Sequence, residues 1–153
     1  MPGKEQAERT PWQVDVDVYV YDQNANPPFR IESYLQTSSG GKLQFHNRGR
    51  HGFLINFHLH DETNQGYKFP MPNEVANALR SQMGTSCPPK GCGQWQEFTA
   101  ERIIQNRSVL VVRNLNETKT EFWYALCITK DDGATYRDLD PGGDNWNGSW
   151  SFT

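Results

Sequence analysis

The chain has 153 residues, of which 35% are hydrophobic, and its 18 acidic and 15 basic residues give a net charge of −3. This length fits one domain, and a slightly acidic chain lacks the basic surface that duplex nucleic acid or an anionic membrane requires. No apolar stretch approaches the roughly 20 residues of a membrane-spanning helix, and the polar first residues carry no secretory signal. We therefore expect a cytoplasmic protein with no nucleic-acid or membrane partner, in which residues 1–11 form a polar N-terminal arm and residues 12–153 one domain.

Alternation of apolar and polar side chains predicts strands along most of the chain. The strongest candidates are Trp12–Asp22, Gly52–Asp61 and Thr120–Lys130, and the weaker ones are Arg30–Leu35, Lys42–His46, Phe98–Ile104, Ser108–Arg113, Ala134–Leu139 and Trp146–Phe152. The alternation predicts that the core contains Val14, Val16, Val18, Phe53, Ile55, Phe57, Phe122, Leu126 and Ile128. The Asn- and Gly-containing segment Asn47–Gly52 predicts a hairpin between its flanking strands.

One segment has the spacing of a helix. Pro72 and Asn73 can begin it, and Val75, Leu79 and Met83 follow one another at intervals of four residues. We therefore expect a single short helix near residues 73–83. Because strands do not alternate with helices along the chain, the expected fold is all-β: an antiparallel two-sheet sandwich of immunoglobulin-like or jelly-roll type.

All four histidines lie between positions 46 and 60, and His58 and His60 fall on one face of a predicted strand, about 7 Å apart. Two imidazoles at this spacing can reach one transition-metal ion. Gly52, His58, His60 and Gln65 resemble part of the first cupin motif, with Gln65 where a glutamate ligand usually stands. The resemblance implies a metal held by His58, His60 and Gln65. A cupin's second motif supplies a further histidine, and the chain has none after His60. We therefore expect the pair to face solvent without a stoichiometric metal, and a cupin-like metalloenzyme is the second alternative function.

The segment 131–150 combines oxygen-bearing side chains with two tryptophans. Its candidate ligand-binding residues are Asp138, Asp140, Asp144, Asn145, Trp146, Asn147 and Trp150. Carboxylate and amide oxygens are the ligands that calcium takes, and Trp beside Asp and Asn can stack on a sugar and hydrogen-bond its hydroxyl groups. Asp and Asn also favour turns for backbone reasons alone. The first alternative function is therefore a small module that binds carbohydrate or calcium through this region.

The sequence carries no motif of nucleophilic catalysis, because neither a GxSxG segment nor a phosphate-binding loop is present. Cys87 and Cys92 flank a loop of Pro, Lys and Gly, and their spacing is longer than that of redox or zinc CxxC pairs. Such a pair can close a small disulfide or supply two metal ligands, but in the cytosol we expect reduced thiols. The chain is thus more consistent with a non-enzyme that needs no cofactor.

Several large side chains fall on the strand faces that point away from the predicted core. They are Tyr19, Tyr21, Leu54 and Trp123. Large apolar or aromatic side chains on outer faces are typical of contact surfaces. The main expectation is therefore a non-catalytic β-sandwich protein that binds a protein partner or assembles with itself as a homo-oligomer.

Overall fold

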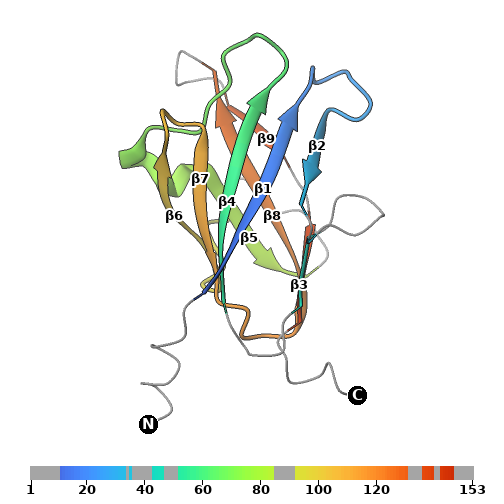
Figure 1. The fold of residues 1–153 in the computed structure, drawn as a ribbon, viewed down its shortest axis with the longest axis vertical. Helices are drawn as coiled ribbons and strands as arrows, with labels where there is room; N and C mark the ends of the chain where they lie inside the picture. The colour runs from blue at the N-terminus through green and yellow to red at the C-terminus, as the bar shows by residue number, and fades with distance from the viewer. Residues whose placement is uncertain are drawn as a thin grey trace.

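In a computed structural model, the chain forms two packed β-sheets and one short 3-10 helix (Figure 1). The structure describes residues 11–33, 35, 43–46, 52–84, 92–130, 136–139 and 142–146, with residues 46 and 142–146 described by their backbone. The two packed sheets confirm the expected all-β sandwich. Among the described residues, no helix has both the length and the apolar character needed to cross a membrane.

One sheet, sheet A, has the strand order β2–β1–β4–β7–β6. Its strands are β1 (Trp12–Val20), β2 (Phe29–Glu32), β4 (Phe53–Asp61), β6 (Phe98–Ile104) and β7 (Val109–Asn114). Strands β1 and β4 are parallel, with Val16 opposite Phe57, whereas the other pairs of the sheet are antiparallel. The antiparallel arrangement expected from the sequence therefore holds for most of sheet A, but not for this interior pair.

The other sheet, sheet B, has the order β3–β10–β8–β5, and β9 also pairs with β8. Its strands are β3 (Leu43–His46), β5 (Leu79–Met83), β8 (Thr120–Thr129), β9 (Tyr136–Leu139) and β10 (Gly142–Trp146). Leu126 of β8 faces Leu139, and Trp123 faces Gly142, so β9 and β10 follow β8 in one continuous register. Strands β3 and β10 are parallel.

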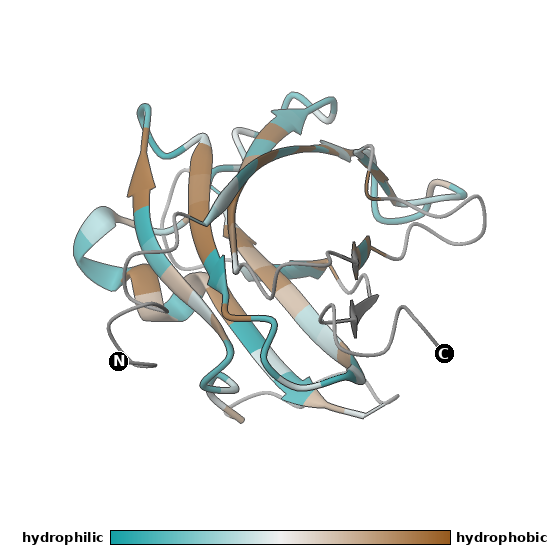
Figure 2. Ribbon diagram, turned by 60° about the horizontal axis from the view of Figure 1, so that its bottom comes forward, coloured by the Kyte–Doolittle hydropathy of each residue, from teal (hydrophilic) through white to brown (hydrophobic). Residues whose placement is uncertain are grey.

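The core lies between the sheets, and all nine residues predicted to form it are at most 1% exposed. Aromatic rings fill its centre: Phe98 lies 4.8 Å from Phe122 and 4.9 Å from Tyr124, measured between ring centroids. In Figure 2 the two sheets curve around this interior, and the connecting loops drawn in colour are mostly hydrophilic. Alternation thus predicted the inward faces correctly, because every second side chain of a strand points to the same face.

The predicted helix is shorter than residues 73–83. Its first part is the 3-10 helix η1 (Pro72–Ala78), and its second part is strand β5. Within β5, Leu79 and Ser81 are buried while Met83 is 54% exposed. A four-residue interval also keeps side chains on one face of a strand, so this spacing does not separate a helix from a strand.

The hairpin predicted over Asn47–Gly52 does not form, because β3 belongs to sheet B and β4 to sheet A. The connection crosses from one sheet to the other. The last strand of the described residues is β10 at Gly142–Trp146, and the strand predicted over Trp146–Phe152 lies outside the described part of the chain apart from Trp146. The polar arm predicted for residues 1–11 also lies outside it, apart from residue 11.

Candidate functional site

The two histidines of the cupin-like segment lie on the outer face of sheet A, as expected. Each is joined to an aspartate of β1: His58 Nε2 lies 2.9 Å from Asp15 Oδ1, and His60 Nε2 lies 2.8 Å from Asp17 Oδ1. The parallel pairing of β1 with β4 creates this arrangement, because both strands advance by two residues between one pair and the next. The hydrogen bond with His58 holds the pKa of Asp15 below its usual value.

The third predicted metal ligand is engaged in another contact. Gln65 is hydrogen-bonded instead to Asp22, with its Nε2 3.4 Å from the Asp22 Oδ1. Within the described residues, no group of three or more His, Cys, Asp or Glu side chains could hold a metal ion. In that same part of the chain, the side-chain hydrogen bonds of His58 and His60 go to Asp15 and Asp17.

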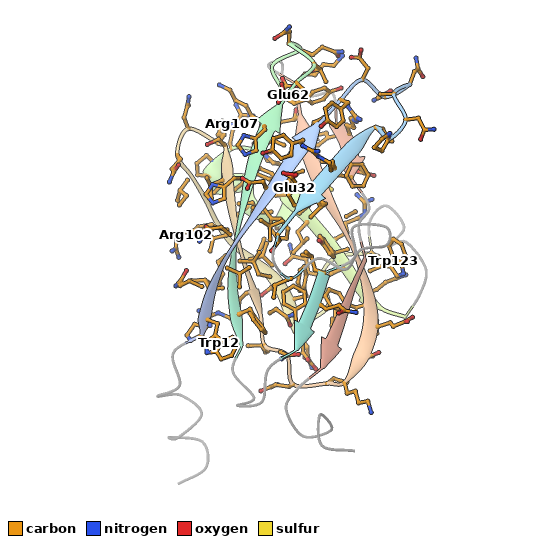
Figure 3. The ribbon with its side chains drawn as sticks, turned by 45° about the vertical axis from the view of Figure 1, so that its right-hand side comes forward. Trp12, Glu32, Glu62, Arg102, Arg107 and Trp123 are labelled. Atoms are coloured by element: carbon orange, nitrogen blue, oxygen red, sulfur yellow. The ribbon has the colours of Figure 1, made fainter. Side chains whose placement is uncertain are left out.

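The outer-face side chains that suggested a contact surface are largely engaged within the chain. The Tyr19 ring stacks on His60 with centroids 4.6 Å apart, and the Arg30 guanidinium lies 4.7 Å from the centroid of the Tyr19 ring. Leu54 is 9% exposed and clusters with Val109 and Val111. Figure 3 shows Trp12 at the opposite end of sheet A from Glu62. Tyr19 and Leu54 are therefore engaged in contacts within the chain.

Of the residues predicted in segment 131–150, one is described with its side chain. Asp138 of β9 lies on the outer face of sheet B, where it lines a pocket. The backbone of Asp144, Asn145 and Trp146 belongs to β10. The remaining candidates, Asp140, Asn147 and Trp150, lie outside the described residues.

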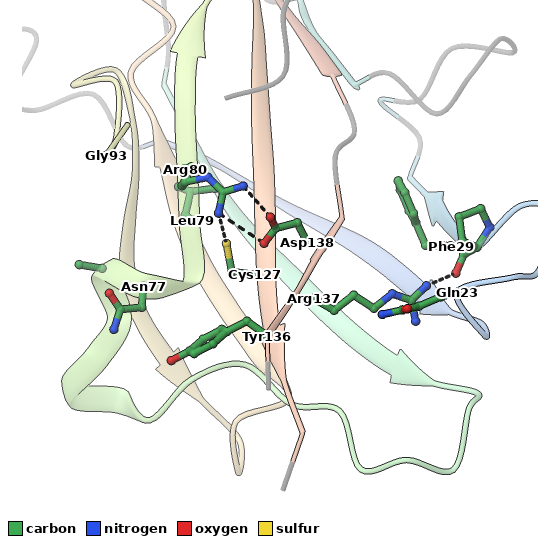
Figure 4. A pocket seen from close by; sticks show the side chains of 12 residues that line it. Gln23, Phe29, Asn77, Leu79, Arg80, Gly93, Cys127, Tyr136, Arg137 and Asp138 are labelled. Carbon is green, nitrogen blue, oxygen red and sulfur yellow. Dashed lines mark hydrogen bonds and ion pairs between the residues drawn. The ribbon is translucent and has the colours of Figure 1, made fainter. Parts of the chain in front are cut away.

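The pocket encloses about 940 Å³ and draws its lining from four parts of the chain (Figure 4). The described lining residues come from the β1–β2 region, from η1 and the strand after it, from Gly93, and from β8 and β9. They are Gln23, Pro28, Phe29, Ala76, Asn77, Leu79, Arg80, Gly93, Cys127, Tyr136, Arg137 and Asp138. This volume is typical of sites that hold a small molecule. Its wall mixes apolar side chains with amide, phenol, thiol and charged groups.

A pair of charged side chains fixes the wall formed by sheet B. The Arg80 guanidinium bonds both oxygens of Asp138, at 2.7 and 3.3 Å, and also lies 3.2 Å from the Cys127 sulfur. These residues come from adjacent strands, since Arg80 faces Ala125 and Asp138 faces Cys127 across the ladders of β8. A two-point Arg–carboxylate contact is both stronger and more directional than a single hydrogen bond. This part of the pocket is therefore rigid before any ligand arrives.

A second arginine joins the pocket to sheet A. Arg137 is 7% exposed, and its guanidinium donates to the carbonyl oxygens of Tyr21 and Pro28 at 2.6 and 2.9 Å. It also lies 5.6 Å from the centroid of the Tyr67 ring. Because β9 side chains alternate, Arg137 points inward whereas its neighbours Tyr136 and Asp138 point outward, so the pocket is lined from both faces of β9. Arg137 thus fastens the edge of sheet B to the loop between β1 and β2.

The described lining includes a carboxylate, a thiol, a phenol and an amide. Asp138, the one carboxylate among the described lining residues, is engaged with Arg80 and is not available as a base. The Cys127 sulfur lies 3.2 Å from the Arg80 guanidinium. Tyr136, which is 44% exposed, and Asn77 offer a ring face and an amide to a ligand.

Most of this site could not be found by sequence motifs. Asp138 was predicted, but its partner Arg80 is 58 residues away and Arg137 contacts carbonyl groups more than 100 residues away. The available signal was in β8, whose second half is apolar on both faces. A continuous apolar run predicts that both faces of a strand are covered, and Arg80 and Asp138 lie over its outer face.

No protein-family model matches this chain, and no curated protein matches it significantly.

Proposed function

We propose that this protein is a non-catalytic binding module that holds a small polar ligand in the sheet B pocket. The observation that carries the proposal is the pocket itself, with about 940 Å³ of space and both arginines held in place by the chain's own atoms. Binding sites of this size with a few preorganised polar groups lose little free energy on ordering. This proposal takes up the alternative of a small ligand-binding module rather than the main expectation of a protein partner.

The pocket favours an organic ligand over calcium. Calcium takes six to eight oxygen ligands, and the carboxylate of Asp138 already bonds Arg80 through both oxygens. An organic ligand can use the exposed Tyr136 ring for stacking and the Asn77 amide for hydrogen bonding. Carbohydrate, the other ligand expected for the 131–150 region, is compatible with these two groups.

A cytoplasmic location is part of the proposal. Cys92 is an exposed free cysteine and Cys127 a buried one. Exposed free thiols persist in reducing compartments.

A thermal-shift screen tests the proposal. Neutral sugars, amino acids, dicarboxylates and sugar phosphates are added separately to the wild-type protein, since a ligand that binds only the folded state raises Tm. We expect at least one compound to raise the wild-type Tm and to have a smaller effect on Tyr136→Ala. The matched control is Arg113→Gln, on sheet A, which should respond like the wild type. Compounds whose effect is lost in Arg113→Gln but kept in Tyr136→Ala would contradict the proposal.

Self-assembly is a second candidate, favoured by two exposed side chains on sheet A. Trp12 is 45% exposed and Ile104 is 36% exposed. Light scattering over a hundredfold range of concentration tests it. A homo-oligomer would give a mass that rises above the 17.6 kDa of one chain, whereas a constant 17.6 kDa would remove this candidate.

A further inference from the structure

We infer that the ligand carries an oxyanion, a carboxylate or a phosphate, and that Arg137 is the residue that recognises it. This inference rests on the proposed function, because it names the chemical class of the ligand in the same pocket. The inference rests on the charge of the pocket lining, on the burial of Arg137 and on the N–H groups of its guanidinium beyond those that bond the two carbonyl oxygens.

The described lining carries an excess positive charge. Arg80 and Arg137 are cationic at every pH at which proteins fold, and Asp138 is the one acidic residue of that lining. The two-point contact between Arg80 and Asp138 neutralises one cation with one anion. One positive charge, that of Arg137, is left over.

The charge of Arg137 has no carboxylate partner among the described residues. Its two hydrogen bonds reach neutral carbonyl oxygens, of Tyr21 and Pro28. The Lys130 ammonium and the Arg137 guanidinium lie 5.8 and 5.6 Å from the centroid of the same Tyr67 ring. Removing a guanidinium from water is unfavourable, and a hydrogen-bonded anion beside it offsets part of that cost. The site therefore favours a ligand that brings a negative charge.

Within the described residues, the hydrogen bonds of the Arg137 side chain go to two carbonyl oxygens. A guanidinium has five N–H groups. The hydrogen bonds to the carbonyl oxygens of Tyr21 and Pro28 use two of them. The planar arrangement of the others matches the two oxygens of a carboxylate or phosphate. The carbonyl contacts hold the guanidinium in position, so binding an oxyanion requires no reordering of the side chain.

The rest of the ligand is defined by what surrounds Arg137. Phe29, Pro28 and Gln23 line the same pocket, and Figure 4 shows Phe29 and Gln23 beside Arg137. An aromatic or aliphatic body can pack on the first two, and the Gln23 amide can hydrogen-bond a polar substituent. The chemical class is therefore a small organic acid or phosphate monoester with an apolar portion.

Calorimetric titration of the full chain with four matched probes tests this inference. Benzoate and phenyl phosphate carry the two oxyanions, benzamide is the neutral isostere of benzoate, and benzamidine supplies the opposite charge. We expect both anions to bind, benzamide to bind at least about tenfold more weakly, and benzamidine to show no binding. The stronger of the two anions identifies the physiological group as carboxylate or phosphate.

Substitutions place the effect at Arg137. Arg137→Gln should reduce benzoate affinity to that of benzamide, Arg137→Lys should retain part of it, and Arg113→Gln on sheet A should leave it unchanged. If Arg137→Gln does not fold, the salt dependence of binding to the wild type replaces it. Added sodium chloride should weaken the binding of benzoate but not that of benzamide.

The outcomes separate the two proposals. If benzamide binds as tightly as benzoate and loses affinity in Tyr136→Ala, the anion inference is overturned and the pocket keeps its proposed function. If benzoate binds equally well to Arg137→Gln, Arg137 is a structural fastener and the inference is overturned in the same way. If no probe binds, the inference is overturned as well, and the thermal-shift screen decides separately on the proposed function.

Discussion

At the scale of single residues, Phe57 is one of the largest fully buried side chains of the core. It is fully buried in β4, and its ring centroid lies 5.8 Å from that of Tyr124 in the opposing sheet. Phe57→Ala removes the ring and leaves a cavity, so we expect the free energy of unfolding to fall by about 3–5 kcal/mol. Urea denaturation measures this change. The exposed Met83→Ala is the control, and equal stabilities of the two variants would show that the inward face is assigned backwards.

Asp61 makes the stability of the loop that follows β4 depend on pH. Its carboxylate accepts hydrogen bonds from the amides of Thr63, Gly66 and Tyr67 and from the Thr63 hydroxyl. Burial raises the pKa of Asp61, but these hydrogen bonds outweigh that effect and lower it below the usual 3.8. A lowered pKa means that the folded state favours the ionised form more than the unfolded state does.

The resulting stability is present above pH 3.8 and is lost as the pH falls through the pKa of the folded protein. We therefore expect the wild type to unfold at higher urea concentration than Asp61→Asn near pH 7, with the gap closing in acid. A carboxyl-detected NMR titration should give a midpoint for Asp61 below 3.8. A midpoint above that value would contradict the hydrogen-bonding account.

At the scale of elements, β5 depends on contacts beyond its ladder. The buried Ser81 hydroxyl donates to the carbonyl of Phe98 and accepts from the amide of Trp95, both at 2.8 Å. The segment around Trp95 thereby covers the free edge of β5, which would otherwise be open to other strands.

Ser81→Ala should lower the free energy of unfolding by about 1–3 kcal/mol, because the buried Phe98 carbonyl loses a donor. Amide hydrogen exchange should accelerate at Trp95 more than at residues of β4. Uniform acceleration over both sheets would instead indicate that β5 and the Trp95 segment do not form a separate unit of stability.

A sequence pattern determines the inward face of a strand but not which strands lie beside it. Alternation identifies which side chains of a strand face inward, so Val14–Val18 and Phe53–Phe57 were assigned correctly. It does not identify the neighbouring strand. The parallel β1–β4 pair and the passage from β3 in sheet B to β4 in sheet A follow from global packing, which no local spacing records.

At the scale of the whole molecule, the candidate site arises where the edges of the two sheets meet. Asp138 was identifiable as a polar residue in a ligand-like segment, whereas Arg80 and Arg137 are single basic residues in ordinary strand contexts. Their roles depend on the pairing of β5 and β9 with β8 and on the hydrogen bond from Arg137 of β9 to the Tyr21 carbonyl in the β1–β2 loop. The paired His58 and His60, the most conspicuous motif of the sequence, lie instead on the outer face of sheet A, bonded to aspartates.

The central claim is that the sheet B pocket is the ligand site, and amide chemical-shift mapping tests it most directly. A compound that raises Tm in the screen is titrated into ¹⁵N-labelled protein. We expect saturable shifts at Asn77, Arg80, Tyr136, Arg137 and Asp138, with the amides of His58 and His60 unmoved. Shifts that gather on β1 and β4 around His58 and His60, with the pocket amides unchanged, would contradict the account.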